Sequence, residues 1–206
     1  VSEYKNKKCI VLDCDNTLWK GVVGEDGFDK IEMSNRTSDG AIFHEIQSLA
    51  LKLHKQGVLL CLCSKNNLQD VEKVLKKNKD MLIRENYIAI KKINWFNKFE
   101  NIKEIAEELN IGLESLVFLD DSPFEVNMIK ENLPEVSSYQ VPEQLSDYPK
   151  QFRSIMNLFY SPSTSYEDQN KTLMYKQQNR REASKKKFMD INDYLSSLSI
   201  NIVLFK

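Results

Sequence analysis

Short apolar runs alternate with amphipathic helical patterns along most of this chain, and this alternation limits the fold more than any other feature. The runs occupy residues 9–12, 58–63, 87–90 and 116–119. Each run is almost continuously apolar, as expected for a strand buried on both faces, and each is followed by a polar loop and a helical pattern. We therefore predict an α/β fold with a doubly wound parallel sheet that helices cover on both faces.

The boundaries of the helices are marked by capping residues. Residues 41–56 place their apolar side chains on one side of a helix, which Gly57 ends. Further helices are expected to begin after Asn67, Asn97 and Ser122. Residues 20–40 contain four glycines among mixed polar residues, a composition that predicts a hairpin or flap rather than a helix.

The composition excludes several classes of protein. With 206 residues and 41% hydrophobic content, the chain is expected to form one main domain with a substantial core. A net charge of −1 provides no basic field for nucleic acid, and there is no apolar run of about 18 residues to span a membrane. We expect a soluble, cytoplasmic protein with no nucleic-acid or membrane partner. Its cysteines have no zinc or disulfide spacing, so we expect reduced thiols.

Acidic and polar residues follow three of the apolar runs. Asp13 and Asp15 end the first run, Ser64 follows the second, and Asp120 and Asp121 come at the end of the fourth. The carboxyl ends of parallel strands meet at one edge of a sheet, so these loops are expected to converge on one crevice. Carboxylates that lie close together repel one another unless a cation such as Mg²⁺, a proton or hydrogen-bond donors offset the repulsion. We therefore predict a working site with a metal at this edge.

These residues resemble the motifs of a known superfamily. The segment Asp13-Cys14-Asp15-Asn16-Thr17, together with Ser64, Lys98 and the pair Asp120-Asp121, looks like the four motifs of the haloacid dehalogenase (HAD) superfamily. More narrowly, residues 15–27, 63–67 and 120–123 resemble the FkbH-like branch, which supplies three-carbon units to polyketide assembly lines. The resemblance implies a HAD-like Rossmannoid core with a small flap in place of a large cap domain.

The resemblance also implies a role for each residue. Asp13 is expected to be the nucleophile toward phosphorus, Asp15 the general acid and base, and Lys98 the cation that neutralises the transferring phosphoryl group. The expected Mg²⁺ ligands are Asp13, Asp15 through its backbone carbonyl, Asp120 and Asp121. Of the last pair we favour Asp120 as the direct ligand. The expected phosphate-binding residues are Thr17, Ser64, Lys65, Asn66 and Lys98.

The role of Cys14 decides between two activities. Its thiol lies between the site aspartates, where Mg²⁺ and Lys98 would favour the thiolate and allow it to carry an acyl group as a thioester. If the strand continues through Asp15, however, Cys14 points away from the face that the aspartates share and is an ordinary buried cysteine. Cys63, directly before Ser64, has the same two interpretations.

The FkbH-like resemblance implies a transferase that is also a phosphatase. It would move a glyceryl-type unit from D-1,3-bisphosphoglycerate to the phosphopantetheine arm of an acyl carrier protein, with dephosphorylation, inside a larger multidomain synthase of polyketide biosynthesis. The alternative is a stand-alone HAD phosphatase that acts on a small phosphorylated metabolite and needs no thiol. A second alternative is a carrier-docking module whose phosphatase chemistry is vestigial.

The domain organisation follows from a change in composition beyond Pro149, where a Ser-Pro-Ser-Thr-Ser stretch leads into a charged, helix-like stretch. We expect residues 1–160 to form the catalytic core, with the flap at about residues 19–40. Residues 161–206 are expected to form a helical extension and a terminal strand that pack on the core, and the natural protein is expected to continue beyond them. Glu167, Asp168, Tyr175, Arg180 and Arg181 in this extension also resemble the FkbH-like branch.

Overall fold

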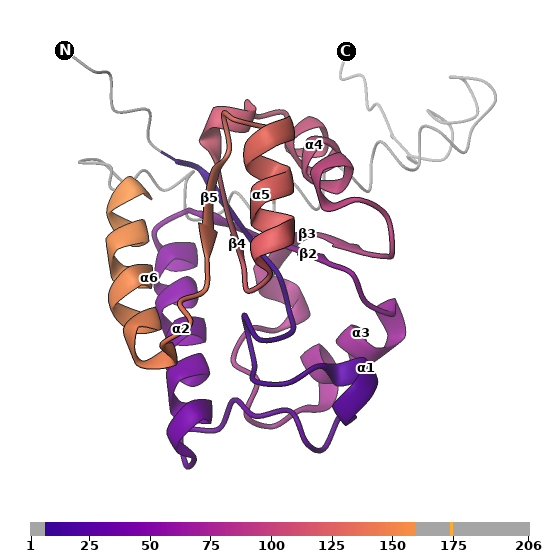
Figure 1. Cartoon of the computed structure of the whole chain (residues 1–206), viewed down its shortest axis with the longest axis vertical. Coiled ribbons are helices and arrows are strands. Elements are labelled where there is room, and N and C mark those ends of the chain that lie inside the picture. Colours follow the sequence, from indigo (N-terminus) through magenta and orange to yellow (C-terminus); the bar gives the residue numbers. More distant parts are fainter. Residues whose placement is uncertain (1–6, 160–173, 175–206) are drawn as a thin grey trace, which may run out of the picture.

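The computed structural model describes residues 7–159 and Met174. A five-stranded sheet with the order β3-β2-β1-β4-β5 lies at its centre (Figure 1). All neighbouring strands are parallel, which confirms the predicted doubly wound α/β fold. The strands are β1 (Cys9–Leu12), β2 (Leu59–Ser64), β3 (Ile88–Ile93), β4 (Leu116–Asp120) and β5 (Ser137–Gln140).

Helices connect successive strands and cover both faces of the sheet. They are α1 (Val23–Asp26), α2 (Ser38–Lys55), α3 (Leu68–Lys77), α4 (Lys98–Leu109), α5 (Pro123–Asn132) and α6 (Tyr148–Met156). Short 3₁₀ turns lie at Glu85–Tyr87, Leu113–Ser115, Leu145–Asp147 and Asn157–Phe159. In the described part of the chain, no helix combines the length and the apolar character that crossing a bilayer requires.

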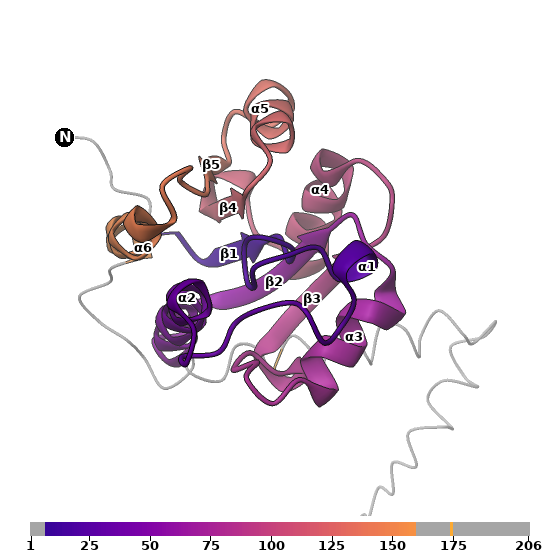
Figure 2. The same cartoon turned by 60° about the horizontal axis from the view of Figure 1, so that its bottom comes forward.

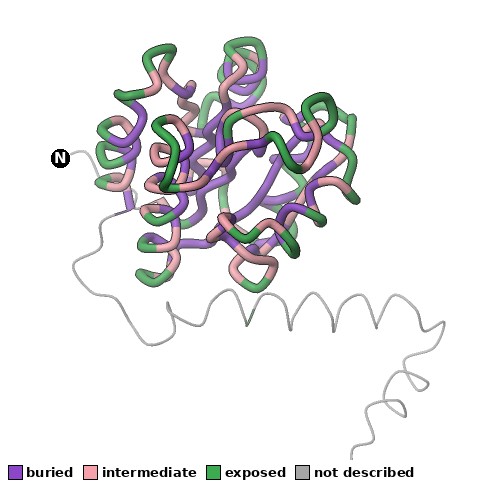
Figure 3. The backbone as a smooth tube through the Cα atoms, turned by 90° about the horizontal axis from the view of Figure 1, so that it is seen from below, coloured by how far each residue is buried: buried purple, intermediate pink, exposed green. Residues whose placement is uncertain are grey.

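Alternation along β1 divides the core into two layers. Ile10 and Leu12 pack with residues of α2, α3 and α6, whereas Cys9 and Val11 pack with residues of α4 and α5 (Figure 2). Figure 3 shows the same arrangement as buried strand segments surrounded by partly exposed helices and loops. The alternation also decides which layer each residue beyond the strand joins, which matters for the site described below.

Some boundaries differ from the sequence-based prediction for local reasons. Helix α2 begins at Ser38 rather than residue 41, because the Thr37 side chain accepts a hydrogen bond from the Gly40 amide at 3.2 Å and caps the helix. The helices after Asn67, Asn97 and Ser122 begin where predicted, but among these three residues only Ser122 makes a side-chain cap bond.

Two elements were not predicted, and one region has a different form. β5 has the polar sequence SSYQ and is only half-buried, so it lacks the apolar run that marks the other strands, and α6 was not predicted either. The region of residues 20–40 contains the short helix α1 and one antiparallel bridge between Lys20 and Glu32 instead of a regular hairpin. The predicted extension at residues 161–206 lies outside the described residues, Met174 excepted.

Candidate active site

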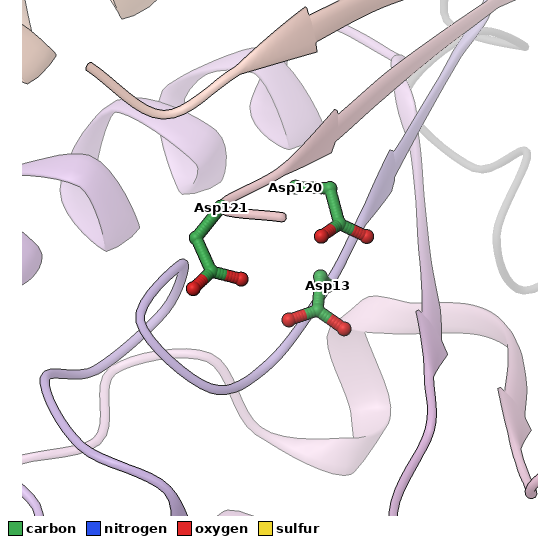
Figure 4. Close-up of side chains that lie close together, drawn as sticks. All are labelled: Asp13, Asp120 and Asp121. Atoms are coloured by element: carbon green, nitrogen blue, oxygen red, sulfur yellow. The ribbon is translucent and has the colours of Figure 1, made fainter. Parts of the chain in front are cut away.

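Three carboxylates converge at the carboxyl end of the sheet. Asp13 follows β1, Asp120 is the last residue of β4, and Asp121 comes next in the chain. One oxygen from each of the three lies within 4.8 Å of the others, and Figure 4 shows the carboxyl groups turned toward one another. The strand register causes this: Leu12 pairs with Leu119, and the Asp13 amide donates to the Leu119 carbonyl at 3.0 Å. The convergence predicted from the sequence is present.

Lys98 lies between two of these carboxylates. It is the first residue of α4 and only 4% exposed, and its Nζ donates to Asp13 Oδ1 and to Asp120 Oδ2 at 2.6 Å each. Burial alone would lower the pKa of Lys98, but the Asp13 and Asp120 carboxylates outweigh burial and hold the pKa above its usual value. The ammonium therefore stays charged and partly offsets the repulsion between the carboxylates.

One cation does not neutralise the whole cluster. Burial, followed by repulsion from Asp13, raises the pKa of Asp120 to about 7, although Lys98 acts in the opposite direction. Burial and Asp13 also raise the pKa of Asp121, which Asn16 counteracts by donating a hydrogen bond to its side chain. The site thus holds more negative charge than its own residues compensate, as expected of a site that binds a further cation.

Three hydrogen-bond donors hold Asp15 outside this cluster. Trp19 Nε1 donates to Asp15 Oδ1 at 2.8 Å, and the Val23 amide donates to the same oxygen at 3.0 Å. Asn66 Nδ2 donates to Asp15 Oδ2 at 2.7 Å. Burial raises the pKa of Asp15, and these three hydrogen bonds counteract only part of the increase. A fixed carboxyl with a raised pKa suits a group that gives up and takes back a proton.

The positioning of Asp15 was not predicted from the sequence. Trp19 and Asn66 were not predicted to contact it, and no role in holding a carboxylate was predicted for the flap. In the structure the flap contributes the Val23 amide, so α1 is tied directly to the site. The position of Trp19 four residues after Asp15 in one loop was the available signal.

The predicted phosphate-binding residues differ in their burial and in their hydrogen-bond and ion-pair partners. Ser64 is 2% exposed at the end of β2, close to the site. Thr17 is fully buried, and among the described residues its hydroxyl has no hydrogen-bond partner. Lys65 forms an ion pair with Glu125 of α5 at 2.7 Å, and not with the carboxylates of the cluster. Asn66 donates its side-chain N–H to Asp15 Oδ2.

The structure answers the question that the sequence left open for the thiols. Cys14 is fully buried and packs with Ile10 and Leu12 in the core layer of α2, α3 and α6. Burial, followed by the nearby Asp13 and Asp15 carboxylates, raises the pKa of the Cys14 thiol far above its usual value. These properties agree with the second interpretation of Cys14, that of an ordinary buried cysteine, since nucleophilic cysteines are accessible and have lowered pKa values.

Cys63 has the same properties on the other face of the sheet. It is fully buried in the layer of α4 and α5, and burial raises the pKa of its thiol well above the usual value. Cys63 therefore also agrees with the interpretation of an ordinary buried cysteine.

The donor set of the cluster fits a hard divalent cation. Asp13, Asp120 and Asp121 offer carboxylate oxygens, the ligands that Mg²⁺ prefers, and these oxygens are close enough to share one ion. Asp15 does not belong to this cluster; the resemblance assigned its backbone carbonyl, rather than its side chain, to the metal. The three carboxylates that are able to hold a metal are thus among those predicted from the sequence.

The chain is similar to known phosphatases. The family described as NLI interacting factor-like phosphatase matches residues 8–168. The N-terminal part of protein BF1531 from Bacteroides fragilis, which contains a phosphatase domain and was solved with Mg, is 42% identical with a TM-score of 0.74. That match covers 77% of this chain, and the chain spans 42% of the length of that protein's structure.

More distant structures also match. 3-Deoxy-D-manno-octulosonate 8-phosphate phosphatase from Moraxella catarrhalis is 15% identical with a TM-score of 0.45, and the match covers 75% of this chain and 88% of the other. A HAD family enzyme from Bacteroides thetaiotaomicron, solved with magnesium and inorganic phosphate, is 16% identical with a TM-score of 0.43, over 65% and 93% of the two chains. No match is found among curated proteins.

Proposed function

The chain belongs to the NLI interacting factor-like phosphatase family, and from this premise we propose that it is a Mg²⁺-dependent phosphatase of a small phosphorylated metabolite. The observation that carries the proposal is the convergence of Asp13, Asp120 and Asp121 beside the buried Lys98. The Mg complex of the Bacteroides fragilis phosphatase domain, at 42% identity, supports the choice of metal.

The metal would be held by the three carboxylates of the cluster. Bound there, Mg²⁺ would supply positive charge that lowers the repulsion between an anionic nucleophile and an anionic phosphate. The remaining catalytic work falls to residues of the chain. Lys98 already contacts Asp13 and would neutralise charge on the phosphoryl group as that group is transferred.

Asp13 and Asp15 divide the chemistry into two steps. In the first, an Asp13 oxygen bonds to phosphorus and the ester P–O bond breaks, while Asp15 gives its proton to the leaving oxygen. In the second, the Asp15 carboxylate takes a proton from water, and the water oxygen bonds to phosphorus as the Asp13–phosphorus bond breaks. Inorganic phosphate and the alcohol are the products, and both aspartates return to their starting states.

Burial of the thiols favours this activity over acyl transfer. A glyceryl transferase that works through an enzyme thioester needs a thiol that can reach its substrate, whereas Cys14 and Cys63 are both 0% exposed. The phosphatase needs only the aspartates and Lys98. Transfer to an acyl carrier protein, implied by the FkbH-like resemblance, remains a prediction that receives no support from these side chains.

The proposal is tested by measuring phosphate release from a panel of phosphomonoesters, beginning with p-nitrophenyl phosphate. We expect release that requires Mg²⁺ and stops when EDTA removes it. If no ester in the panel is cleaved, or if cleavage continues unchanged in EDTA, the proposed function is wrong.

Cys14→Ala is expected to leave phosphatase activity within about threefold of the wild type, since a buried thiol with a raised pKa takes no part in either step. The measurement is kcat/KM for p-nitrophenyl phosphate, with Cys61→Ala as a control for the loss of a buried sulfur elsewhere in the sheet. A loss of more than about 100-fold in Cys14→Ala alone would return this thiol to the mechanism.

Mg²⁺ is expected to raise the melting temperature even without substrate. A ligand at about 100 times its Kd stabilises a protein by about 2.7 kcal/mol, or about 5–10 °C for a domain of this size. Asp121→Asn should remove most of this shift, whereas Asp147→Asn, which changes an exposed carboxylate at the start of α6, should keep it. An equal Mg²⁺-dependent shift in both variants, measured by calorimetry, would place the metal elsewhere.

A further inference from the structure

Two large aromatic side chains are exposed to solvent beside the site. Trp95 and Phe96 are 69% and 71% exposed in the loop that connects β3 to α4. Leu68, at the start of α3, is 44% exposed. Exposed apolar side chains add nothing to the stability of the core. A patch of them on a protein surface often marks a binding site, so these three residues are candidate ligand contacts.

These residues line a cavity of about 630 Å³. Its walls include Leu68, Ile93, Trp95 and Phe96, with the amides of Asn66 and Asn67 among them. Small-molecule sites are typically clefts of about 300–1,000 Å³ with mostly apolar walls and a few polar groups. We call this cavity the Trp95 pocket.

The loop that presents the aromatic residues is held in place. The side-chain amides of Asn94 and Asn101 donate to each other at 3.1 and 2.8 Å, and the Phe96 amide donates to Asn94 Oδ1 at 3.0 Å. The backbone N–H of Asn94 donates to the backbone carbonyl of Ser64 at 3.2 Å, which connects the loop to β2. The loop is therefore hydrogen-bonded to both α4 and β2.

The Trp95 ring itself is also oriented. Its Nε1 donates to Asn67 Oδ1 at 3.2 Å, and Asn67 Nδ2 in turn donates to Asp70 Oδ2 at 3.2 Å. Because this hydrogen bond already fixes the exposed indole, the Trp95 side chain loses little conformational entropy when a ligand packs against its apolar face.

The Trp95 pocket adjoins the catalytic carboxylates. Asn66 lines the pocket and also donates to Asp15 Oδ2 at 2.7 Å. Asp15 is the group proposed to protonate the leaving oxygen of the ester, so the alcohol must lie next to it. The loop that carries Phe96 also leads directly to the site, because Lys98 follows Phe96 by two residues and contacts Asp13.

From this adjacency we propose that the Trp95 pocket binds the organic part of the substrate, a phosphomonoester whose alcohol carries an uncharged, apolar group the size of a ring. The inference rests on the proposed phosphatase function. Trp95 and Phe96 supply apolar contact. Asn66, whose Nδ2 carries a second N–H besides the one donated to Asp15, supplies a hydrogen bond to a polar atom near the ester. Asp70 also lines the pocket, which disfavours an anionic substituent. A wholly polar three-carbon unit would leave the apolar walls unused.

Binding is tested with two phosphonates, whose P–C bond the proposed mechanism does not break. 2-Phenylethylphosphonate carries a ring and ethylphosphonate does not, and calorimetric titration in Mg²⁺ gives Kd for both. We expect the wild type to prefer the phenyl compound by about tenfold or more, and Trp95→Ala to reduce the preference to about twofold. Phe124→Ala is the matched control, because Phe124 is an aromatic residue 64% exposed outside the Trp95 pocket, and it should keep the preference.

Hydrolysis supplies a second readout. The kcat/KM ratio of 2-phenylethyl phosphate to ethyl phosphate should fall in Trp95→Ala, mostly through KM for the phenyl ester. Equal or absent binding of the two phosphonates by the wild type, or a preference that survives Trp95→Ala, would overturn the pocket assignment. A preference that Trp95→Ala removes, with neither ester hydrolysed, would uphold the pocket and contradict the proposed phosphatase function.

Discussion

Asp13→Asn is expected to lower kcat for p-nitrophenyl phosphate by about 10⁴-fold or more, the scale of loss seen when an enzyme loses its nucleophile. The neutral amide is a poor nucleophile toward phosphorus. It also reduces the charge available to a metal beside Asp120 and Asp121. The expected result is therefore a folded protein without measurable turnover.

The substitution is informative because its effect on folding should be small or favourable. An asparagine keeps a carbonyl oxygen that is able to accept the Lys98 hydrogen bond, and it removes the repulsion that helps to raise the pKa of Asp120. We therefore expect the metal-free melting temperature of Asp13→Asn to equal or exceed that of the wild type. Native turnover in Asp13→Asn would show that another group attacks phosphorus.

Lys98→Met is expected to affect both activity and stability. Loss of the ammonium should lower kcat by about 10²-fold or more, since one donor to a developing anion contributes on this scale. In the metal-free protein it also leaves Asp13 and Asp120 buried at 4% and 0% exposure without their cation. Removal of one partner from a buried ion pair typically destabilises a protein by about 3–5 kcal/mol.

The loss of stability in Lys98→Met should depend on pH with a definite sign. Without the ammonium, burial and repulsion from Asp13 raise the pKa of Asp120 further above its unfolded value. A carboxyl with a raised folded pKa favours the folded state at low pH and loses that contribution as pH rises through the folded pKa. The deficit relative to wild type should therefore be largest at about pH 8 and shrink toward about pH 5, and Mg²⁺ should also reduce it.

Lys92→Met is the matched control for this experiment. Lys92 lies six residues before Lys98 in the chain, and it forms ion pairs with Glu104 and Glu108, both at 2.6 Å, at the surface of α4. Exposed pairs of this kind contribute about 1 kcal/mol or less. Denaturant unfolding at several pH values compares the variants. The assignment of Lys98 as the buried cation of the site is contradicted if Lys92→Met loses as much free energy of unfolding as Lys98→Met, or more. It is also contradicted if the Lys98→Met deficit grows on acidification.

The fold was largely predictable because burial on both faces leaves a simple signal in a strand. β1 is continuously apolar, β2 and β4 are apolar up to their last residues, Ser64 and Asp120, and the helices after them have regular periodicity. β5 gave no such signal, because an edge strand that is half-buried tolerates the sequence SSYQ. Strand pairing by backbone hydrogen bonds, rather than side-chain burial, defines that element.

The site was predictable to the extent that it depends on strand ends. Asp13, Ser64 and Asp120 were placed correctly because parallel strands align their carboxyl ends. The direction of Cys14 depends on whether the strand alternation continues past Leu12, which only the coordinates decide.

Contacts across loops were less accessible from the sequence. The bonds of Asp15 to Trp19, Val23 and Asn66 depend on the path of the flap and of the loop after β2, and neither loop has a periodic pattern. The exposure of Trp95 and Phe96 was also unpredictable, because an aromatic residue in a loop is equally compatible with burial.

The most direct test of the central claim uses Asp15→Asn with p-nitrophenyl phosphate and Mg²⁺. The nitrophenolate leaves without a proton donor, so the first step should still proceed, whereas the second step lacks its base and should stall. Intact-mass spectrometry after rapid acid quenching should then find one phosphoryl group on the protein, and peptide mapping should place it on Asp13. Phosphate release without any adduct at any quench time, or an adduct on another residue, would contradict the account.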